Sequence, residues 1–315
     1  MKSVLITGVA GNIGSALALA LLKNENYTIV GVDNLSTGAR HKLPLLTDRF
    51  RFIKSDVNDY REISAIFHAN NFDYVFHFAA VVGVQRTLAN PLLVLSDIDG
   101  IKNILSLSNN CSVKKVFYSS SSEVYGEPVS LPQHEATTPL NSRLPYAIVK
   151  NIGEAFFRSY YEEHGLPYTI FRFFNTYGPN QSEDFVVPRF LKAALRHEPI
   201  SIYGDGSQTR TFCYIEDNID TLISCLENDL FTNDVLNIGS DIEFTIKSLA
   251  ELLIKMTNSK SVINYLSPLK EGDMTRRKPD ISKMRQVLKR DLIPLEQGIE
   301  RLIQQYSKAS LIHGK

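Results

Sequence analysis

The sequence contains no tryptophan, few methionines and only three cysteines. Cys111, Cys213 and Cys225 are odd in number, widely spaced and without the intervals typical of metal ligands. We therefore expect no metal site and interpret the cysteines as packing residues in a reducing compartment. The sequence also lacks the apolar region and cleavage site of a signal peptide, and its apolar runs are too short to span a bilayer. These absences predict a cytoplasmic protein.

An excess of either charge is also absent, because Lys plus Arg and Asp plus Glu each number 34. No global field therefore favours nucleic acid or a membrane as a partner. Hydrophobic residues make up 43% and charged residues 22% of the 315-residue chain, which is ordinary for a folded protein. The length suits one large α/β domain with a smaller lobe, and local groups must bind any anionic ligand.

Short runs rich in β-branched and aromatic residues alternate with helical patterns from the start of the chain. Strands are expected at residues 4–7, 27–33, 52–53, 74–78, 116–119 and 168–173. Strands separated by helix-length segments predict crossover connections and a parallel sheet with helices on both faces. The sequence thus predicts an α/β fold with a doubly wound parallel sheet.

The alternation of strand and helix patterns ends at about Tyr177, after which prolines and glycines divide the chain into shorter segments. These residues are Pro179, Pro188, Pro199, Gly204 and Gly206. We interpret residues 1–177 as the domain of the parallel sheet and residues 178–315 mainly as a smaller, loop-rich C-terminal region. A segment at about 217–240 is expected to rejoin the first domain, so we expect no single clean boundary.

A glycine-rich turn follows the first predicted strand and begins a predicted helix. Gly8, Gly11 and Gly14 allow a tight turn, close approach of the backbone to a pyrophosphate, and N–H groups that face the anion. Asn12 and Ile13 lie in the same turn and belong to this candidate cofactor site. Three glycines can also serve the turn alone, so the motif is weak by itself.

Acidic residues follow the second and third predicted strands. Asp33 is placed to accept hydrogen bonds from an adenosine ribose and to disfavour a 2′-phosphate, so NAD is predicted in preference to NADP. Its neighbour Asn34 belongs to the same candidate site. Asp56 and Val57 could meet the adenine edge, although a capping or turn role for the aspartate is an equal alternative.

Tyr146 and Lys150 form a Tyr-x-x-x-Lys pair whose spacing places both side chains on one helix face. A nearby ammonium favours the phenolate, so the tyrosine could act as a base near neutral pH. The pattern is common in isolation. Here, however, a serine-rich stretch at 119–122 and Glu123 follow a strand, where an open α/β sheet presents reactive side chains.

In combination these motifs resemble the extended short-chain dehydrogenase/reductase family, whose members epimerise, dehydrate or decarboxylate nucleotide sugars. The resemblance covers essentially the whole length and includes the Asn-Thr-Tyr-Gly-Pro run at 175–179. It implies a Rossmann-type sheet, a tightly held NAD and a C-terminal region that binds a nucleotide sugar, with UDP as the expected nucleotide. It also implies that Ala79 and Ala80 lie at the cofactor.

The resemblance assigns a role to each catalytic candidate. Tyr146 would take the proton from a sugar hydroxyl, usually at carbon 4, while hydride leaves the same carbon for the nicotinamide. Lys150 would hold the nicotinamide ribose and tune the tyrosine. Ser121 would hydrogen-bond the reacting oxygen, and Ser122 is a further catalytic candidate.

Four residues are expected to bind the nucleotide end of the substrate. By resemblance, Asn175 contacts the diphosphate, while Arg210 and Arg277 supply charge-assisted hydrogen bonds. Tyr203 is a candidate to lie beside the base. We therefore expect the diphosphate to be held by groups outside the cofactor domain as well as within it.

Glu123 bears on which reaction follows oxidation. The hydroxyl-Ser-Glu run resembles nucleotide-sugar decarboxylases and GDP-mannose 4,6-dehydratases, whereas 4-epimerases usually have small or apolar residues there. A carboxylate beside the sugar ring could move a second proton after the 4-keto sugar forms. The alternative is a glutamate that points away and pairs with a backbone amide or a basic side chain.

Other stretches resemble different members of the family. Residues 204–214 and 277–281 resemble UDP-glucuronate decarboxylases, whereas 77–84 and 270–273 are closer to 4-epimerases, and Asp97 sits where many relatives have asparagine. We expect a UDP-glucuronate decarboxylase-like enzyme, with a UDP-sugar 4-epimerase acting on UDP-glucose or UDP-glucuronate and then a 4,6-dehydratase as alternatives. The non-enzyme alternative is an NAD-binding regulatory scaffold, which has no need of an intact tyrosine, lysine and serine.

The helical segments at 88–109 and 146–164 are expected to form a four-helix bundle in a homodimer.

Overall fold

A seven-stranded sheet forms the centre of the computed structural model, which describes residues 1–268 and 274–313. Its strand order is β11-β6-β5-β4-β1-β2-β3, and every neighbouring pair is parallel. The strands are β1 (Lys2–Thr7), β2 (Tyr27–Asp33), β3 (Phe50–Lys54), β4 (Tyr74–His77), β5 (Lys115–Ser121), β6 (Tyr168–Phe173) and β11 (Asp234–Ile238). The predicted doubly wound parallel sheet is confirmed.

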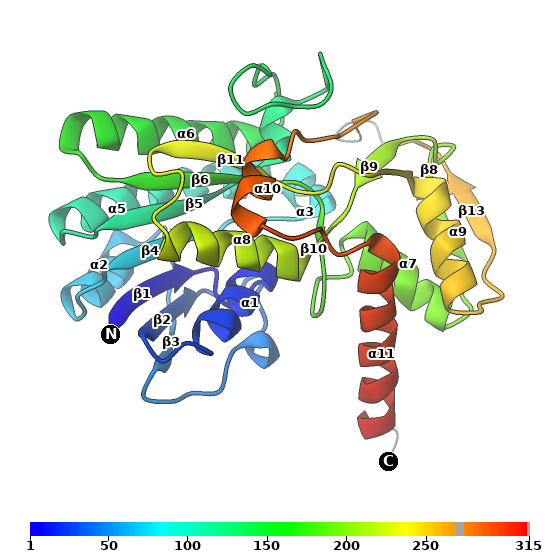
Figure 1. The fold of residues 1–315 in the computed structure, drawn as a ribbon, viewed down its shortest axis with the longest axis horizontal. Helices are drawn as coiled ribbons and strands as arrows, with labels where there is room; N and C mark the ends of the chain where they lie inside the picture. The colour runs from blue at the N-terminus through cyan, green and yellow to red at the C-terminus, as the bar shows by residue number, and fades with distance from the viewer. Residues whose placement is uncertain (269–273, 314–315) are drawn as a thin grey trace.

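Helices cover both faces of this sheet (Figure 1). One face packs against α1 (Asn12–Leu21), α8 (Ile215–Glu227) and α10 (Ser282–Leu288), and the other against α2 (Tyr60–His68), α5 (Asp97–Asn110) and α6 (Pro145–His164). Along β1, Val4 and Ile6 enter the first core and Leu5 enters the second. This alternation follows from the two-residue period of a strand buried on both sides.

The chain reverses its direction of travel across the sheet between β3 and β4. The first three strands run outward from β1 in one direction, and β4, β5, β6 and β11 run outward in the other. β1 and β4 are therefore neighbours whose following loops diverge. Such a switch point leaves a crevice outside the carboxyl ends of the strands, where open α/β sheets bind ligands.

The smaller region lies to the right in Figure 1 and is more regular than the predicted loop-rich region. Its elements are α7 (Val186–Leu195), β8 (Ile200–Tyr203), β9 (Thr209–Thr211), β12 (Glu243–Thr245), α9 (Ile246–Met256), β13 (Ile263–Leu266) and α11 (Leu295–His313). β8 pairs with β13, and β9 pairs with β12. Pro188 does not break α7 because it lies in the first turn, where a backbone N–H has no intrahelical partner.

Short elements complete the described chain. They are η1 (Arg40–Lys42), α3 (Val84–Ala89), α4 (Pro91–Leu95), η2 (Ser122–Tyr125), β7 (Thr176–Tyr177) and β10 (Cys213–Tyr214). Cys213 and Cys225 are buried in the first core, and Cys111 packs on the second, which confirms the packing interpretation. Among the described residues, the helices are too short or too polar to cross a membrane.

The chain returns to the sheet after entering the smaller region. β11 pairs with β6, and α8 packs beside α1. A single hydrophobic core then runs from Val4 and Leu17 through to Phe190 and Leu249 of the smaller region. The exact residue boundaries of the two predicted domains stay a proposal, because the two regions share this core.

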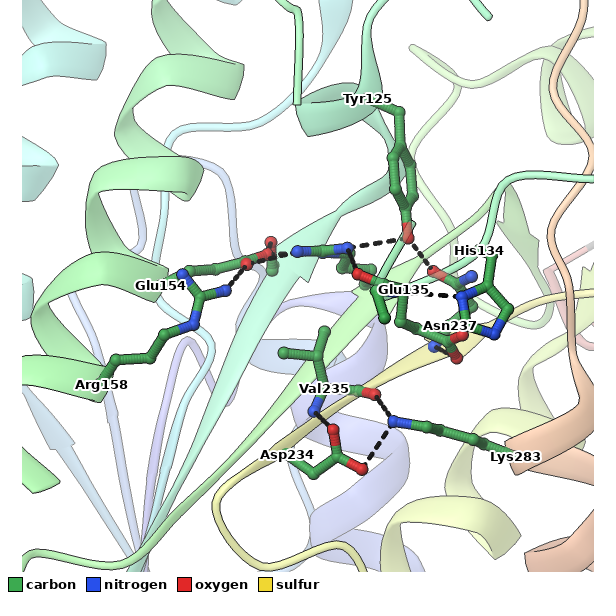
Figure 2. A network of polar contacts seen from close by, with 12 residues as sticks. Tyr125, His134, Glu135, Glu154, Arg158, Asp234, Val235, Asn237 and Lys283 are labelled. Atoms are coloured by element: carbon green, nitrogen blue, oxygen red, sulfur yellow. Dashed lines mark hydrogen bonds and ion pairs between the residues drawn. The ribbon is translucent and has the colours of Figure 1, made fainter. Parts of the chain in front are cut away.

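A buried ion pair fixes α6 to the sheet (Figure 2). Glu154 of α6 is fully buried and accepts hydrogen bonds from Arg172 Nη2 of β6 at 2.6 Å and from Ser120 Oγ of β5 at 2.6 Å. Arg172 Nη1 donates in turn to the Tyr125 hydroxyl at 2.9 Å, and that hydroxyl donates to Asn237 Oδ1 at 2.7 Å. The network joins five elements, α6, β6, β5, η2 and β11, the first of which carries the Tyr-x-x-x-Lys pair.

Candidate functional site

A cavity of about 370 Å³ lies over the carboxyl ends of the central strands. Its wall includes segments that follow six of them, at residues 8–14, 33–42, 55–58, 78–83, 119–123 and 173–176. The N-terminal turn of α6 and Arg277 complete the part of the wall that contains the catalytic candidates. Every predicted cofactor residue and every predicted catalytic residue lines this one cavity. Their roles stay predictions.

The glycine turn is as tight as the cofactor interpretation requires. Gly8 has a φ of +69°, and a Cβ there would lie 2.7 Å from the backbone of Phe78 and Ala79. A Cβ at Gly14 would overlap the carbonyl oxygen of Gly8. The N-cap of α1 is Gly11, and the first turn of the helix has no acidic residue and no side-chain cap. The backbone N–H groups at the N-terminus of α1 are therefore left open, and they fit the pyrophosphate of a dinucleotide.

Asp33, at the end of β2, is held in place by backbone N–H groups of neighbouring segments. Asp33 accepts hydrogen bonds from Ala10 N at 2.9 Å and Leu35 N at 2.7 Å, and only 8% of it is exposed. Burial raises the pKa of Asp33, while these two N–H groups and the Lys42 ammonium oppose the rise. The carboxylate is thus fixed at the cavity wall, where it can still meet a ribose diol.

Asp56 has the turn role that the sequence left as an alternative. Its Oδ1 accepts a hydrogen bond from Asn58 N at 2.9 Å, and its Oδ2 accepts one from Asn34 Nδ2 at 3.0 Å. The second bond draws the loops after β2 and β3 together. Asp56 also lines the cavity beside Val57, so the turn role and the predicted adenine contact are compatible.

Lys150 is buried beneath the cavity beside Tyr146. Its Nζ donates a hydrogen bond to Ser119 Oγ at 3.3 Å and lies 5.7 Å from the centre of the Tyr146 ring and 5.0 Å from that of Tyr118. Burial lowers the pKa of Lys150 to about 8, and Asp97 opposes this fall. His77 also lies near the ammonium, and its own burial lowers its pKa to about 3, so its ring is neutral.

The pKa of Tyr146 moves opposite to the direction predicted from the sequence. Desolvation by burial is the largest cause of the rise, and the Glu123 carboxylate adds to it. A hydrogen bond with Ser121 and the charge of Arg277 oppose the rise. The phenol is therefore harder to ionise than free tyrosine in the described structure, because loss of water outweighs the neighbouring cations.

The serine candidates lie at the end of β5, where the sheet meets η2. Ser121 Oγ accepts a hydrogen bond from Glu123 N at 3.2 Å and caps this short helix. The same hydroxyl bonds to Tyr146, which fits the predicted contact with the reacting oxygen. Ser122 is buried and also lines the cavity.

Glu123 faces the cavity and forms an ion pair with Arg277. Its Oε1 lies 2.7 Å from Arg277 Nη2, and the two side chains are 14% and 7% exposed. The other oxygen, Oε2, is buried and accepts no hydrogen bond from the described residues. Glu123 thus pairs with a basic side chain, as one alternative foresaw, but it lines the cavity and does not point away.

A backbone pairing far from the glycine turn holds Arg277 in place. Gln133 N donates to Lys278 O at 2.7 Å, and Asp280 N donates to Gln133 O at 2.8 Å. The segment that carries the arginine is thus bound to the loop that follows η2. The predicted diphosphate contact of Arg277 stays a prediction, because its guanidinium is occupied by Glu123 in the described structure.

Of the other predicted substrate residues, one lines the cavity and two lie outside its wall. Asn175 lines the cavity, and its Nδ2 donates to Thr211 O at 3.1 Å. Arg210 is buried in β9, donates to Thr209 O at 2.8 Å and lies outside the wall. Tyr203 also lies outside it, with the guanidinium of Arg189 5.9 Å from its ring centre. The stretch 270–273 lies outside the described residues.

Several wall residues were not predicted from the sequence as site residues. Ser36, Thr37 and Lys42 lie beside Asp33, and Gln181 follows the Asn175 segment. A signal was present for the first group, since polar residues directly after the acidic strand end face the same crevice. Gln181 has no comparable signal, because its position depends on a bond from its Nε2 to Thr176 O at 2.6 Å.

The fold and the cavity together define an α/β enzyme of the dinucleotide-binding class, with its site at the switch point of the sheet. When bound, NAD supplies a hydride acceptor and donor. The glycine turn and Asp33 fit its pyrophosphate and adenosine ribose, and the contact of Lys150 with its second ribose stays a prediction.

Comparison with known proteins identifies the family. The NAD dependent epimerase/dehydratase family matches residues 4–239, and the chain belongs to this family. It is 34% identical to a UDP-N-acetyl-alpha-D-glucosaminuronate decarboxylase of Bacillus cytotoxicus, over 96% of this chain and 97% of the relative. It is also 34% identical to UDP-glucuronic acid decarboxylase 3 of Arabidopsis thaliana, over 90% and 83%. The solved UDP-glucose 4-epimerase of Thermotoga maritima superposes with a TM-score of 0.91 at 31% identity, covering 98% of this chain and 99% of that one.

These likenesses extend over nearly the whole chain and include relatives of known reaction. They show an NAD-dependent, nucleotide-sugar-modifying enzyme and exclude the catalytically idle scaffold as the simplest interpretation.

Proposed function

We propose that the chain oxidises carbon 4 of the sugar in a UDP-linked uronic acid and then removes its carboxyl group, as a UDP-glucuronate decarboxylase does. The single observation that carries this proposal is the Glu123–Arg277 pair in the wall beside Tyr146. The names of the two decarboxylase relatives support it.

In the first step, three side chains act at the sugar hydroxyl on carbon 4. Tyr146 takes the hydroxyl proton once the Tyr146–Lys150 pair has lost one proton, and Ser121, already bonded to the tyrosine, orients the reacting oxygen. Lys150 lies on the same helix face and holds the cofactor ribose. Because Lys150 is buried and Tyr146 is partly buried, the proton and the substrate meet largely away from water, where each electrostatic contact is stronger.

In the second step, the chemistry follows from the oxidised sugar. Oxidation at carbon 4 of a uronic acid produces a β-keto acid, which loses carbon dioxide because the carbonyl accepts the released electron pair. The enzyme then needs to orient the carboxyl group and to return a proton to carbon 5. The hydride that the bound cofactor would have accepted must then return to carbon 4, so that the net reaction is loss of carbon dioxide alone. Glu123 would first take up a proton at its buried Oε2 and then deliver it to carbon 5, while Arg277 fixes the orientation of its carboxyl group.

A UDP-sugar 4-epimerase is the second candidate. The close superposition on the Thermotoga maritima enzyme favours it, and so does the resemblance of residues 77–84 to the epimerase loop. An epimerase needs the oxidation step and rotation of the keto sugar. It does not need a second proton-transfer group, so Glu123 is the residue that separates the two candidates.

The test is incubation of the NAD-loaded enzyme with a panel of nucleotide sugars, followed by mass analysis of the products. Our proposal predicts loss of carbon dioxide from UDP-glucuronate or a closely related uronic acid. Loss of water would instead indicate a dehydratase. An unchanged mass with inverted stereochemistry would indicate an epimerase, and either result would overturn the decarboxylase proposal.

We also propose that the enzyme works in the cytoplasm as a homodimer. α4 and α6 leave large apolar side chains exposed, among them Leu92 (80% exposed), Ile148 and Tyr161. Pairing of these helices with a second copy would cover them. Sedimentation analysis tests this, because Leu92→Asp should convert a dimer to a monomer, whereas a monomeric parent protein would contradict it.

A further inference from the structure

Asn237 is a fully buried polar residue in the edge strand of the central sheet. It lies in β11 between Leu236 and Ile238, both of which belong to the first hydrophobic core. Burying an amide costs free energy unless its donors and its acceptor are hydrogen-bonded. The partners of this amide therefore indicate which part of the molecule it holds.

Asn237 uses its side chain and its backbone N–H to join β11 to three other segments. Nδ2 donates to Gln133 O at 2.8 Å and to Asp280 O at 3.1 Å. Oδ1 accepts a hydrogen bond from the Tyr125 hydroxyl at 2.7 Å, and the backbone N–H donates to Glu135 Oε1 at 2.8 Å. Figure 2 shows Asn237 beside Tyr125 and Glu135. The amide thus contacts η2, the loop that follows it and the segment before α10.

The two carbonyl groups that bind Nδ2 belong to the backbone pairing that holds Arg277. Asp280 N donates to Gln133 O at 2.8 Å, and Gln133 N donates to Lys278 O at 2.7 Å. Asn237 Nδ2 bridges the two sides of this pairing and ties both of them to the edge of the sheet. Arg277 directly precedes Lys278, so the amide holds the backbone on which the arginine side chain is built.

The side-chain contacts of Arg277 do not fix this backbone by themselves. Nη2 lies 2.7 Å from Glu123 Oε1, at the end of a long side chain that can move if its backbone moves. Nε donates to Met274 Sδ at 3.2 Å, but Met274 belongs to the same segment. The ion pair in the cavity wall therefore depends on contacts that place the segment against the rest of the molecule.

The contacts made just before this arginine are closer to water. Thr275 N donates to Glu127, and both residues are exposed. Arg276 is 51% exposed where it pairs with Glu243. Contacts at exposed positions contribute little, because water competes for the same groups. The buried amide of Asn237 therefore contributes more to the position of the segment than these contacts do.

We propose that Asn237 is a positioning residue, which acts through Arg277 by fixing the segment 277–280 against β11, so that the guanidinium meets Glu123 in the cavity wall. Its effect on the reaction rests on the proposed function, in which Glu123 acts after oxidation. The placement of Arg277 does not depend on that function, because it follows from hydrogen bonds within the chain.

The test is hydrogen exchange at Arg277 Nε–H, followed by NMR with isotopically labelled arginine and assigned from loss of the signal in Arg277→Met. Asn237→Ala removes both bonds to the segment, so exchange should accelerate by about tenfold or more. Thr169→Val is the matched control. It removes another bond of a fully buried side chain, from Thr169 Oγ1 to Phe231 O, at the opposite end of the β6–β11 pair, and should leave Arg277 unchanged.

Unchanged exchange in Asn237→Ala, or an equal acceleration in Thr169→Val, would overturn the proposal. If Asn237→Ala does not fold, the parent protein still decides the matter. Arg277 Nε–H and Asp280 N–H should then open together and show the same free energy of opening, because one anchor holds both. An arginine that opens far more readily than Asp280 N–H would also overturn the proposal.

A kinetic measurement separates positioning from loss of folded enzyme. With UDP-glucuronate, Asn237→Ala should still form NADH but release carbon dioxide up to about 100-fold more slowly, because a displaced Arg277 no longer orients Glu123. Equal slowing of both steps would indicate a merely structural role and overturn the proposal. Failure of the proposed function would show separately, as an unchanged substrate mass with the Arg277 exchange result intact.

Discussion

Glu123 Oε1 and Arg277 Nη2 meet at 2.7 Å in the cavity wall, although the two residues lie far apart in the sequence. One follows the central strand β5, and the other precedes α10. The pair therefore couples the segment that follows β5 to the C-terminal segment at the cavity wall.

Removing only one member of this pair should destabilise the protein. Glu123→Ser leaves the largely buried Arg277 without its partner, and we expect the free energy of unfolding to fall by about 3 kcal/mol. Chemical denaturation measures the loss. The double variant Glu123→Ser with Arg277→Met should recover part of it, because neither charge then remains unpaired. Additive losses would show that the two residues do not interact.

Tyr146→Phe should abolish most of the oxidation step without unfolding the protein. A positioned general base typically contributes about 10²–10⁴-fold to rate, so we expect turnover to fall by that factor. The measurement is the appearance of NADH absorbance after addition of the nucleotide sugar. Tyr161→Phe, at a 41% exposed position on the same helix, is the control and should turn over like the parent enzyme. Full turnover in Tyr146→Phe would remove the base assignment.

The pH dependence of oxidation should report Tyr146 and Lys150 as one titrating pair. The pKa of Lys150 is lowered to about 8 and that of Tyr146 is raised, so the first proton leaves the pair near pH 8. The pair with one proton fewer is the form that can accept the substrate's proton. We therefore expect the oxidation rate to rise with pH and to level off above about pH 8.

Lys150→Met provides the check on this assignment. The remaining Tyr146 has a raised pKa, so the midpoint of the rate profile should move upward by more than one unit as the rate falls. Rapid-mixing measurements of NADH formation across pH give both profiles. A midpoint that stays in place after this substitution would show that another group limits the reaction.

Gly8→Ala should weaken NAD binding through crowding more than through backbone strain. A methyl group there would meet the backbone after β4 at 2.7 Å. Gly165→Ala is a matched control, because Gly165 also has a positive φ, of +71°, but has open space at its Cβ. Both variants should lose about 1 kcal/mol of stability from strain. Calorimetric titration should show that only Gly8→Ala loses affinity for NAD, and equal affinities would contradict the turn geometry.

The buried pair beneath α6 should matter far more to stability than its exposed neighbour. Glu154→Gln leaves Arg172 buried and uncompensated, with an expected loss of about 3–5 kcal/mol (Figure 2). Arg158 also bonds to Glu154 but is 41% exposed, so Arg158→Ala should cost less than about 1 kcal/mol. Denaturant unfolding of the two variants compares these values. Equal losses would show that burial does not set the energetics here.

The strands and the cofactor half of the site could be predicted because their signals are local. Val4, Leu5 and Ile6 predict a buried strand directly, and the glycine turn and Asp33 follow strands at fixed distances along the chain. α7 was obscured by Pro188, which is harmless in a first helical turn. The sequence pattern therefore predicts the sheet more completely than the smaller region.

The sugar half of the site depends on contacts between distant segments. The position of Arg277 is set by backbone pairing of its neighbours with Gln133, and no residue near either segment signals that pairing. The pKa of Tyr146 was mispredicted for a related reason. Helical spacing places Lys150 nearby, but it does not reveal the desolvation of the phenol or the approach of Glu123.

The central claim is that carbon 4 of a uronic acid is oxidised and that Glu123 then acts on the keto sugar. The most direct measurement adds UDP-glucuronate to NAD-loaded Glu123→Ser and follows NADH absorbance and carbon dioxide release together. The account predicts that NADH accumulates while carbon dioxide release is strongly slowed. Carbon dioxide release at the parent rate, or inversion at carbon 4 without any release by the parent enzyme, would contradict it.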